Sequence, residues 1–214
     1  MAELPLSAAT LAIIRNEPVQ ARSHARLTAL LDAAAQVIDE IGFERLTTAM
    51  VADRAGASIG TVYRYFPDRI SVLQNLAARN VERTTARALE RIRDPEHGDW
   101  LSALSAAFEV FVEAYREEPG FASLRLGDVV DLRPAIGVPA IAVFAAQLHD
   151  ALVERFSLPD SPESRDAVEA AVVLSDAIAA RAFTRVPQGD EGFLDYGRRA
   201  TISLLSEYFG EPRR

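Results

Sequence analysis

The chain has 214 residues, of which 49% are hydrophobic and 25% are charged, as in ordinary globular proteins of one or two domains. It has no cysteine and three histidines, so disulfides, thiolate metal sites and a catalytic cysteine are excluded. All 23 basic residues are arginine, and the formal net charge at pH 7 is −8. A protein this acidic can bind a polyanion only through a locally basic surface.

The charge is unevenly distributed along the chain. Residues 1–80 carry eight arginines and eight acidic residues, whereas residues 81–214 carry 15 arginines and 23 acidic residues. Within residues 45–79, five arginines accompany two acidic residues, which gives a net charge of +3. A positive segment on an acidic body suits phosphate binding with little non-specific association, although chance explains the asymmetry equally well when it is taken alone.

The first 21 residues predict no regular helix, because Pro5 and Pro18 interrupt them. We interpret residues 1–21 as an N-terminal arm. Arginines at and beyond its end suit a minor groove, and a tail without contact to DNA is the alternative; they are Arg15, Arg22 and Arg26. An early apolar run is too short to span a membrane and lacks the basic start of a secretion signal, so we expect a cytoplasmic protein without a membrane segment.

The next segment predicts a long amphipathic helix that ends at Gly42. Its apolar residues recur at steps of three and four: Leu27, Leu30, Leu31, Ala34, Val37, Ile38 and Ile41. One continuous apolar face of this kind is expected to support the segment that follows.

Residues 47–66 predict two short helices that pack across a glycine turn. The pair Thr47 and Thr48 offers a hydroxyl cap to the first helix, and Ser58 caps the second. Gly56 suits the left-handed backbone conformation that ends a helix. Two short helices at a steep angle across such a turn form a helix-turn-helix, whose second helix reads the major groove of DNA.

Small and apolar residues supply the core of this helix pair. Met50, Val51 and Ala55 are expected to face inward, Ala52 lets the two helices approach closely, and Val62 closes the core from the second helix. The second helix otherwise carries mostly hydroxyls and hydrogen-bond donors, which suit a groove and its phosphates; its residues are Gly60, Thr61, Tyr63, Arg64 and Tyr65.

This segment and its flanks, over residues 22–80, resemble the TetR-type (tetracycline-repressor-like) family of bacterial transcription regulators. The family pattern is met by Gly42 and Phe43, Thr47 and Thr48, Ala52, Gly56, Ser58, Gly60 and Thr61, Tyr63 and Phe66, and Arg69. Arg69 stands where lysine is usual and keeps its positive charge. Ile70 stands where an acidic residue is usual, so only Asp68 is left to cap the next helix.

The resemblance implies an all-α fold of about nine helices. A three-helix DNA-binding domain at residues 22–68 would precede a helical effector-binding and dimerisation domain at residues 69–214. The family resemblance implies a homodimer, most often a repressor, that binds a palindromic operator in double-stranded DNA and is released by a small molecule. The candidate DNA-binding residues are Thr48, Ser58, Gly60, Thr61, Tyr63, Arg64, Tyr65 and Arg69.

Different contacts are expected from these residues. Arg64 suits a bidentate contact to guanine or, equally, a contact to a phosphate. Tyr63 is expected at base edges with Gly60 and Thr61, although it can also be largely a packing residue. Phosphate contacts are expected from Thr48, Tyr65 and Arg69.

Beyond Pro67 the periodicity predicts helices and no strand. Helices are expected from just after Asp68 to about Arg93, from about Leu101 to near Pro119, and over 121–131, 140–156, 163–184 and 191–209, with a loop at 132–139. The helix over 163–184 carries small and apolar residues around much of its circumference, and the helix over 191–209 adds Phe193, Tyr196, Ala200, Leu204 and Tyr208. We expect these two helices to form the dimer interface. The alternative is that both belong to the core of one chain.

An apolar and aromatic set is the candidate lining of an effector pocket, for an apolar or aromatic molecule, although a stripe of helical spacing is usually ordinary core. The set is Trp100, Leu104, Phe108, Phe111, Tyr115, Phe121 and Phe144, with Phe156 as a further aromatic residue. The candidate polar groups, each of which can instead be a structural partner, are Arg125, Asp128, His149 and Asp176.

The chain lacks the sequence patterns of other chemistries. There is no phosphate loop, dinucleotide fingerprint, nucleophile elbow or H-E-x-x-H, so we expect no cofactor, no metal site and no catalytic residues. A helical protein-binding module without DNA recognition is one alternative function, and an enzyme built on the helical body is another. The intact reading helix favours the DNA-binding hypothesis over both.

Overall fold

The computed structural model describes residues 17–125 and 140–211. Over these residues the chain forms nine α-helices and one short 3₁₀ segment, with no strand, which confirms the all-α class. The helices are α1 (Glu17–Ile41), α2 (Thr48–Arg54), α3 (Ile59–Tyr65), α4 (Arg69–Arg93), α5 (Trp100–Glu117), α6 (Phe121–Leu124), α7 (Ala140–Phe156), α8 (Pro162–Arg185) and α9 (Glu191–Phe209), and the 3₁₀ segment is η1 (Phe43–Arg45).

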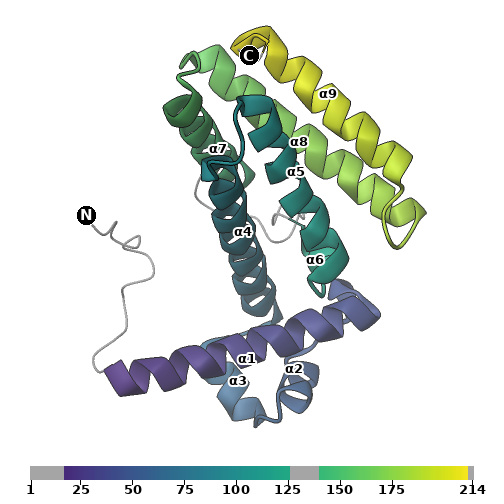
Figure 1. Cartoon of the computed structure of the whole chain (residues 1–214). Coiled ribbons are helices and arrows are strands. Elements are labelled where there is room, and N and C mark those ends of the chain that lie inside the picture. The colour runs from purple at the N-terminus through teal and green to yellow at the C-terminus, as the bar shows by residue number, and fades with distance from the viewer. Residues whose placement is uncertain (1–16, 126–139, 212–214) are drawn as a thin grey trace.

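Helices α1 to α3 form one end of the molecule, which we call the head, and α4 to α9 form the body (Figure 1). Helix α1 lies across the foot of α4, with α2 and α3 on the side of α1 away from the body. Helices α8 and α9 run side by side at one outer side of the body. The head therefore presents α2 and α3 at the end of the molecule opposite the body.

The start of α1 differs from the sequence-based expectation. The helix begins at Glu17, so residues 17–21 of the predicted arm belong to it. Pro18 does not prevent this, because the first N–H groups of a helix have no partner within the helix and the proline ring already holds a helical φ. The rest of the predicted arm, including Arg15, lies outside the described residues.

Several helix boundaries agree with the prediction because short polar side chains cap the first turns. Asp68, Asp99 and Asp190 each accept a backbone N–H of the helix that follows, as does Ser161 at α8. Hydrogen bonds from the backbone and side chain of Ser71 hold the pKa of Asp68 below its usual value. The predicted extension of α6 to residue 131 and the loop at 132–139 lie almost entirely outside the described residues.

Two hydrophobic cores meet at α6. The head core takes the predicted stripe of α1, with Leu30 and Ile38 almost fully buried, together with Val51 and Val62. The body core is built mainly from α5, α7, α8 and α9. Phe121 belongs to the body core, whereas Leu124, three residues later, belongs to the head core.

The turn before α6 holds the head against the body. Gly120 has a φ of +71°, and its N–H donates to Asp39 Oδ1 of α1 over 3.1 Å. A Cβ on Gly120 would lie 3.0 Å from the carbonyl oxygen of Ala35 and 3.1 Å from Ile38 Cγ2, so only glycine fits this contact without displacement. Arg79 of α4 adds an ion pair of 2.6 Å to Asp32 of α1.

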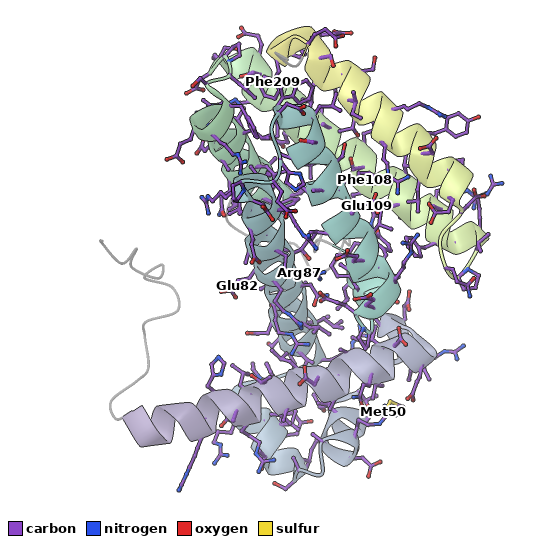
Figure 2. All side chains as sticks on the ribbon, viewed as in Figure 1. Met50, Glu82, Arg87, Phe108, Glu109 and Phe209 are labelled. Atoms are coloured by element: carbon purple, nitrogen blue, oxygen red, sulfur yellow. The ribbon has the colours of Figure 1, made fainter. Side chains whose placement is uncertain are left out.

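Polar contacts on the body surface join α5 to its neighbours. Arg87 of α4 pairs with Glu113 at 2.6 Å and with Glu118 at 3.2 Å. On the other side of α5, Arg198 of α9 pairs with Glu109 at 2.7 Å; Figure 2 labels Arg87 and Glu109. Among the described residues, no helix combines the length and apolar character needed to cross a membrane.

Candidate DNA-binding surface and effector cavity

The turn between α2 and α3 has the predicted geometry. Thr47 Oγ1 accepts the N–H of Met50 at 3.2 Å, and Ser58 Oγ accepts the N–H of Thr61 at 3.1 Å. Gly56 has a φ of +56°, and the backbone bonds from Gly56 N to Asp53 O and from Ala57 N to Ala52 O close a Schellman motif. These bonds fix the orientation of α3 relative to α2.

One inward-facing residue of α2 was predicted wrongly. Val51 is fully buried and Ala52 nearly so, whereas Met50 is 42% exposed. Met50 is labelled in Figure 2. Successive residues of a helix point about 100° apart, and the narrow contact of so short a helix accommodates Val51 and Ala52 but not Met50 as well. Arg54 anchors the other end of α2 to Glu40 of α1 at 2.6 Å, and this pairing lowers the pKa of the Glu40 carboxyl.

The residues predicted to read DNA lie together on and beside α3. Gly60 and Arg64 are exposed, and Tyr63 is 53% exposed, so packing inside the protein does not account for this tyrosine. Thr48 Oγ1 donates to Tyr63 Oη over 3.4 Å. The hydroxyl of Tyr65 lies 3.2 Å from Ser23 Oγ of α1. Helix α3 is thus braced from α1 and α2 while its outer side stays open.

Gly60 has no structural reason to be glycine. It lies in α3, and an added Cβ would have only Ser58 Oγ, at 3.9 Å, as a neighbour. Alanine would favour the helix here. A glycine that the protein itself does not require, on an exposed helix, is consistent with a close approach by a partner.

Arg69 has an internal role that sequence reasoning missed. Its Nη1 donates to the carbonyl oxygens of Glu44, at 2.7 Å, and Phe43, at 3.3 Å. The guanidinium thereby holds η1 against the start of α4. Its remaining N–H groups can still donate to a phosphate, so the predicted DNA contact stays a prediction.

A basic groove joins α1 to α3. It is lined by Arg22, Ser23, Ala25, Arg26, Ala29, Arg64 and Tyr65. Arg22 and Arg26, which were expected just beyond the end of the N-terminal arm, both lie on α1. Three guanidinium groups beside the open face of α3 make this the positive side of the head.

The body contains a small apolar cavity between α5, α7, α8 and α9. Its volume is about 50 Å³, and it is lined by Leu104, Ala107, Phe108, Phe111, Phe144, Leu148, Val168, Ala171, Val172, Ser175, Thr201 and Leu205. Four predicted pocket residues belong to this wall: Leu104, Phe108, Phe111 and Phe144. Ligand pockets for drug-sized molecules are roughly 300–1,000 Å³. The cavity would therefore have to widen to hold one.

The other predicted pocket residues that the structure describes do not line the cavity. Tyr115 stacks on Phe183 at 4.9 Å between ring centroids and contacts Phe121 edge-on at 5.2 Å. Trp100 packs edge-on against Phe209 at 5.6 Å. His149 is fully buried, with its Nε2 at 2.9 Å from Ser164 Oγ at the start of α8. Asp128 lies outside the described residues.

Arg125 and Asp176 form a polar cluster with Tyr115. Asp176 is 3% exposed, pairs with Arg125 and accepts the Tyr115 hydroxyl at 3.2 Å. Burial raises the pKa of Tyr115 to about 12, partly offset by the nearby positive charge of Arg125. The φ of Arg125 is +53°, a backbone conformation that residues other than glycine rarely adopt. Phe121 and Tyr115 place this cluster beside the junction of head and body.

Sequence reasoning missed the polar part of the cavity wall. Ser175 of α8 and Thr201 of α9 lie in helices that were assigned to the dimer interface. Their hydroxyl oxygens are 3.1 Å apart. No sequence spacing relates two residues on different helices, so only the packing of α8 on α9 brings them together. Gly197 permits that packing, since a Cβ there would lie 3.0 Å from Ile178 Cγ2.

The short helices joined by a glycine turn, with an exposed and partly basic α3, define a helix-turn-helix protein carrying a helical body. Residues 30–76 match the family model described as bacterial regulatory proteins, tetR family, and residues 98–209 match the model described as tetracyclin repressor-like, C-terminal domain. The chain belongs to the TetR family. This is a family of transcription regulators rather than enzymes.

Individual relatives agree with this assignment. The chain resembles a TetR-family transcriptional regulator from Streptomyces coelicolor whose crystal structure is known. The two sequences are 30% identical, and their structures align with a TM-score of 0.73 over 86% of this chain and 99% of that one. The HTH-type transcriptional repressor KstR of Rhodococcus jostii (strain RHA1) is 28% identical over 149 residues, 69% of this chain and 66% of KstR. The HTH-type transcriptional regulator BetI of Stenotrophomonas maltophilia (strain R551-3) is 42% identical over 64 residues, 30% of this chain and 32% of BetI. The chain thus spans two thirds or less of these two curated relatives.

Proposed function

We propose that this protein is a homodimeric, cytoplasmic transcriptional repressor that binds a palindromic operator through α3 and releases it when a small, largely apolar molecule enters the body. The observation that carries the proposal is the exposed side of α3, which includes Gly60, Tyr63 and Arg64. The Ser58 cap and the contacts from α1 and α2 hold this helix in place. Arg64 and Tyr63 meet base edges or the adjacent backbone, and Arg22 and Arg26 of α1 add phosphate contacts. Similarity to KstR of Rhodococcus jostii, an HTH-type transcriptional repressor, supports the repressor assignment.

Operator selection tests the DNA-binding proposal. The full-length protein would be used to select duplexes from a randomised pool, and the enriched site would be footprinted. We expect two half-sites about one helical turn apart, because a two-fold dimer places its two reading helices in successive major grooves. Absence of any enriched duplex at low salt would contradict the proposal.

An arginine pair separates base reading from simple charge. Arg64→Ala is expected to weaken operator binding and relax the base preference at one position, at a cost of roughly 1–3 kcal/mol if the contact to guanine is bidentate. Arg91→Ala removes the same charge from an exposed position on α4, and its effect is expected to be small. Equal losses for the two variants would contradict base reading by Arg64.

Dimerisation is proposed to use the exposed faces of α8 and α9. Val173 is 47% exposed and Tyr196 is 63% exposed, and neither side chain is needed to fill the core of one chain. Pairing these faces with a second copy would form a four-helix bundle. We expect Val173→Glu to yield monomers in sedimentation experiments. Val143→Glu, at a 42% exposed valine of α7, is the matched control and should leave the dimer intact.

Release from DNA is proposed to run from the cavity through α6. Phe111 lines the cavity and lies edge-on to Phe121 at 6.0 Å, and the preceding Gly120 is bonded to Asp39 of α1. Widening the cavity would displace Phe111 and, through α6, shift the head relative to the body. A coupling of about 1–3 kcal/mol is typical of such linkage.

A further inference from the structure

The side chains around the cavity leave one place for a polar contact. Every lining side chain is a hydrocarbon except those of Ser175 and Thr201, which lie side by side on α8 and α9. The chemistry of these two hydroxyls therefore determines which polar group an occupant can carry.

The number of hydroxyl hydrogens determines which of the two residues donates the hydrogen bond between Ser175 and Thr201. Ser175 Oγ donates to the carbonyl oxygen of Ala171, one turn earlier in α8, at 2.8 Å. A serine hydroxyl has a single hydrogen, so the contact of 3.1 Å between Ser175 Oγ and Thr201 Oγ1 must use the hydrogen of Thr201. Thr201 Oγ1 is left with acceptor capacity, and no donor from the described residues satisfies it.

We infer that the effector is an uncharged, largely hydrocarbon molecule that carries a hydroxyl or N–H group and donates it to Thr201 Oγ1. This inference rests on the proposed effector function of the cavity. A carbonyl in the same place would oppose one acceptor with another. A carboxylate or an ammonium group would lose its hydration without meeting an opposite charge on the wall.

The volume of the cavity limits the size of the molecule that can enter it. At about 50 Å³ it has room for roughly three to five water molecules. A single ring already requires side chains to move, and Phe108 of the wall contacts Arg198, whose guanidinium carbon lies 5.3 Å from the ring centroid. One-ring compounds are therefore the appropriate probes.

Four compounds with one carbon skeleton test the inference. Toluene, benzyl alcohol, benzaldehyde and benzoate would be titrated calorimetrically into the full-length protein and into Thr201→Val, which keeps the shape of the side chain and removes the acceptor. The quantity compared is the ratio of the Kd of toluene to that of benzyl alcohol, because the hydration of each compound cancels between the two proteins. Thr184→Val is the control, since Thr184 lies on α8, which packs against the α9 helix of Thr201, but is exposed and outside the cavity wall.

The expected result is a fall in this ratio of about threefold to tenfold in Thr201→Val, the usual size of one hydrogen bond, and no change in Thr184→Val. Ser175→Ala frees the hydrogen of Thr201, so benzaldehyde should gain relative to benzyl alcohol. An unchanged ratio in Thr201→Val, tighter binding of benzoate than of benzyl alcohol, or no binding of any probe would overturn the inference. Operator binding is measured separately without probes, so failure of the DNA-binding proposal is distinguished from failure of this one.

Discussion

Replacing Gly60 with alanine should strengthen the fold and weaken DNA binding at once. Gly60 is the second residue of α3, and the new methyl group would meet only Ser58 Oγ, at 3.9 Å. Alanine is favoured over glycine in helices, and in the first turn we expect roughly 0.5–1 kcal/mol. For a chain of this size that gain corresponds to a rise in Tm of about 1–4 °C.

The same methyl group would stand where α3 is proposed to meet DNA. If the backbone of Gly60 packs against the duplex, a methyl group inserted there costs roughly 1–3 kcal/mol, which is a loss of about fivefold to 150-fold in affinity. Thermal unfolding and fluorescence anisotropy on the selected operator would measure the two effects in one preparation. Misfolding of the variant would lower both the Tm and the operator affinity, so a higher Tm together with a weaker affinity cannot arise from it.

A second glycine provides the control. Gly192 is the second residue of α9 and lies on the body, and a Cβ there would meet Asp190 Oδ1 at an ordinary 3.4 Å. Gly192→Ala should give a similar gain in Tm without any change in operator affinity. The operator affinity of Gly60→Ala is compared with that of the unchanged protein and of Gly192→Ala. Equal affinities in all three proteins would refute the close approach of α3 to DNA.

Three further substitutions test contacts described above. Arg69→Ala should destabilise the head by about 1–2 kcal/mol, through loss of its two carbonyl contacts, and weaken binding to operator and random duplexes alike in gel shifts; intact affinity for both would rule out the phosphate contact. Gly120→Ala should lower the free energy of unfolding by about 1–3 kcal/mol in urea titrations, because of its φ of +71° and its contact with α1, and a neutral result would show that the turn adjusts. Tyr115, whose pKa is raised from 10.0 to about 12, should contribute stability that is fully present below about pH 10 and lost as the pH rises towards 12, by up to about 3 kcal/mol. Tyr115→Phe should remove this part of the pH dependence, and identical stability profiles for the two proteins would contradict the assignment.

The helix-turn-helix could be predicted from the sequence because its determinants are local. A cap such as Ser58 acts on a backbone N–H three residues away, and Gly56 is required by its own φ. The orientation of Met50 could not be derived in the same way, since neighbouring apolar residues compete for one narrow contact. Its outcome depends on how closely α2 packs against α1.

The lining of the body cavity was predictable only in part because it depends on packing between distant segments. The spacing on α5 correctly selected Leu104, Phe108 and Phe111 as one face. The same spacing cannot show that Tyr115 is covered by Phe183 rather than open to the cavity. The internal bonds of Arg69 were equally inaccessible, since they join α4 to carbonyl groups about 25 residues earlier.

The position of Leu124 has a consequence for how the protein can be divided. A fragment ending at Arg93 would contain every helix of the head and all of α4, yet it would lack one fully buried side chain of the head core. An unfilled space of that size typically costs about 2–5 kcal/mol, a large share of the stability of a small domain. The fragment ending at Arg93 should therefore have a Tm well below that of the intact chain. The intact chain should unfold in a single cooperative step.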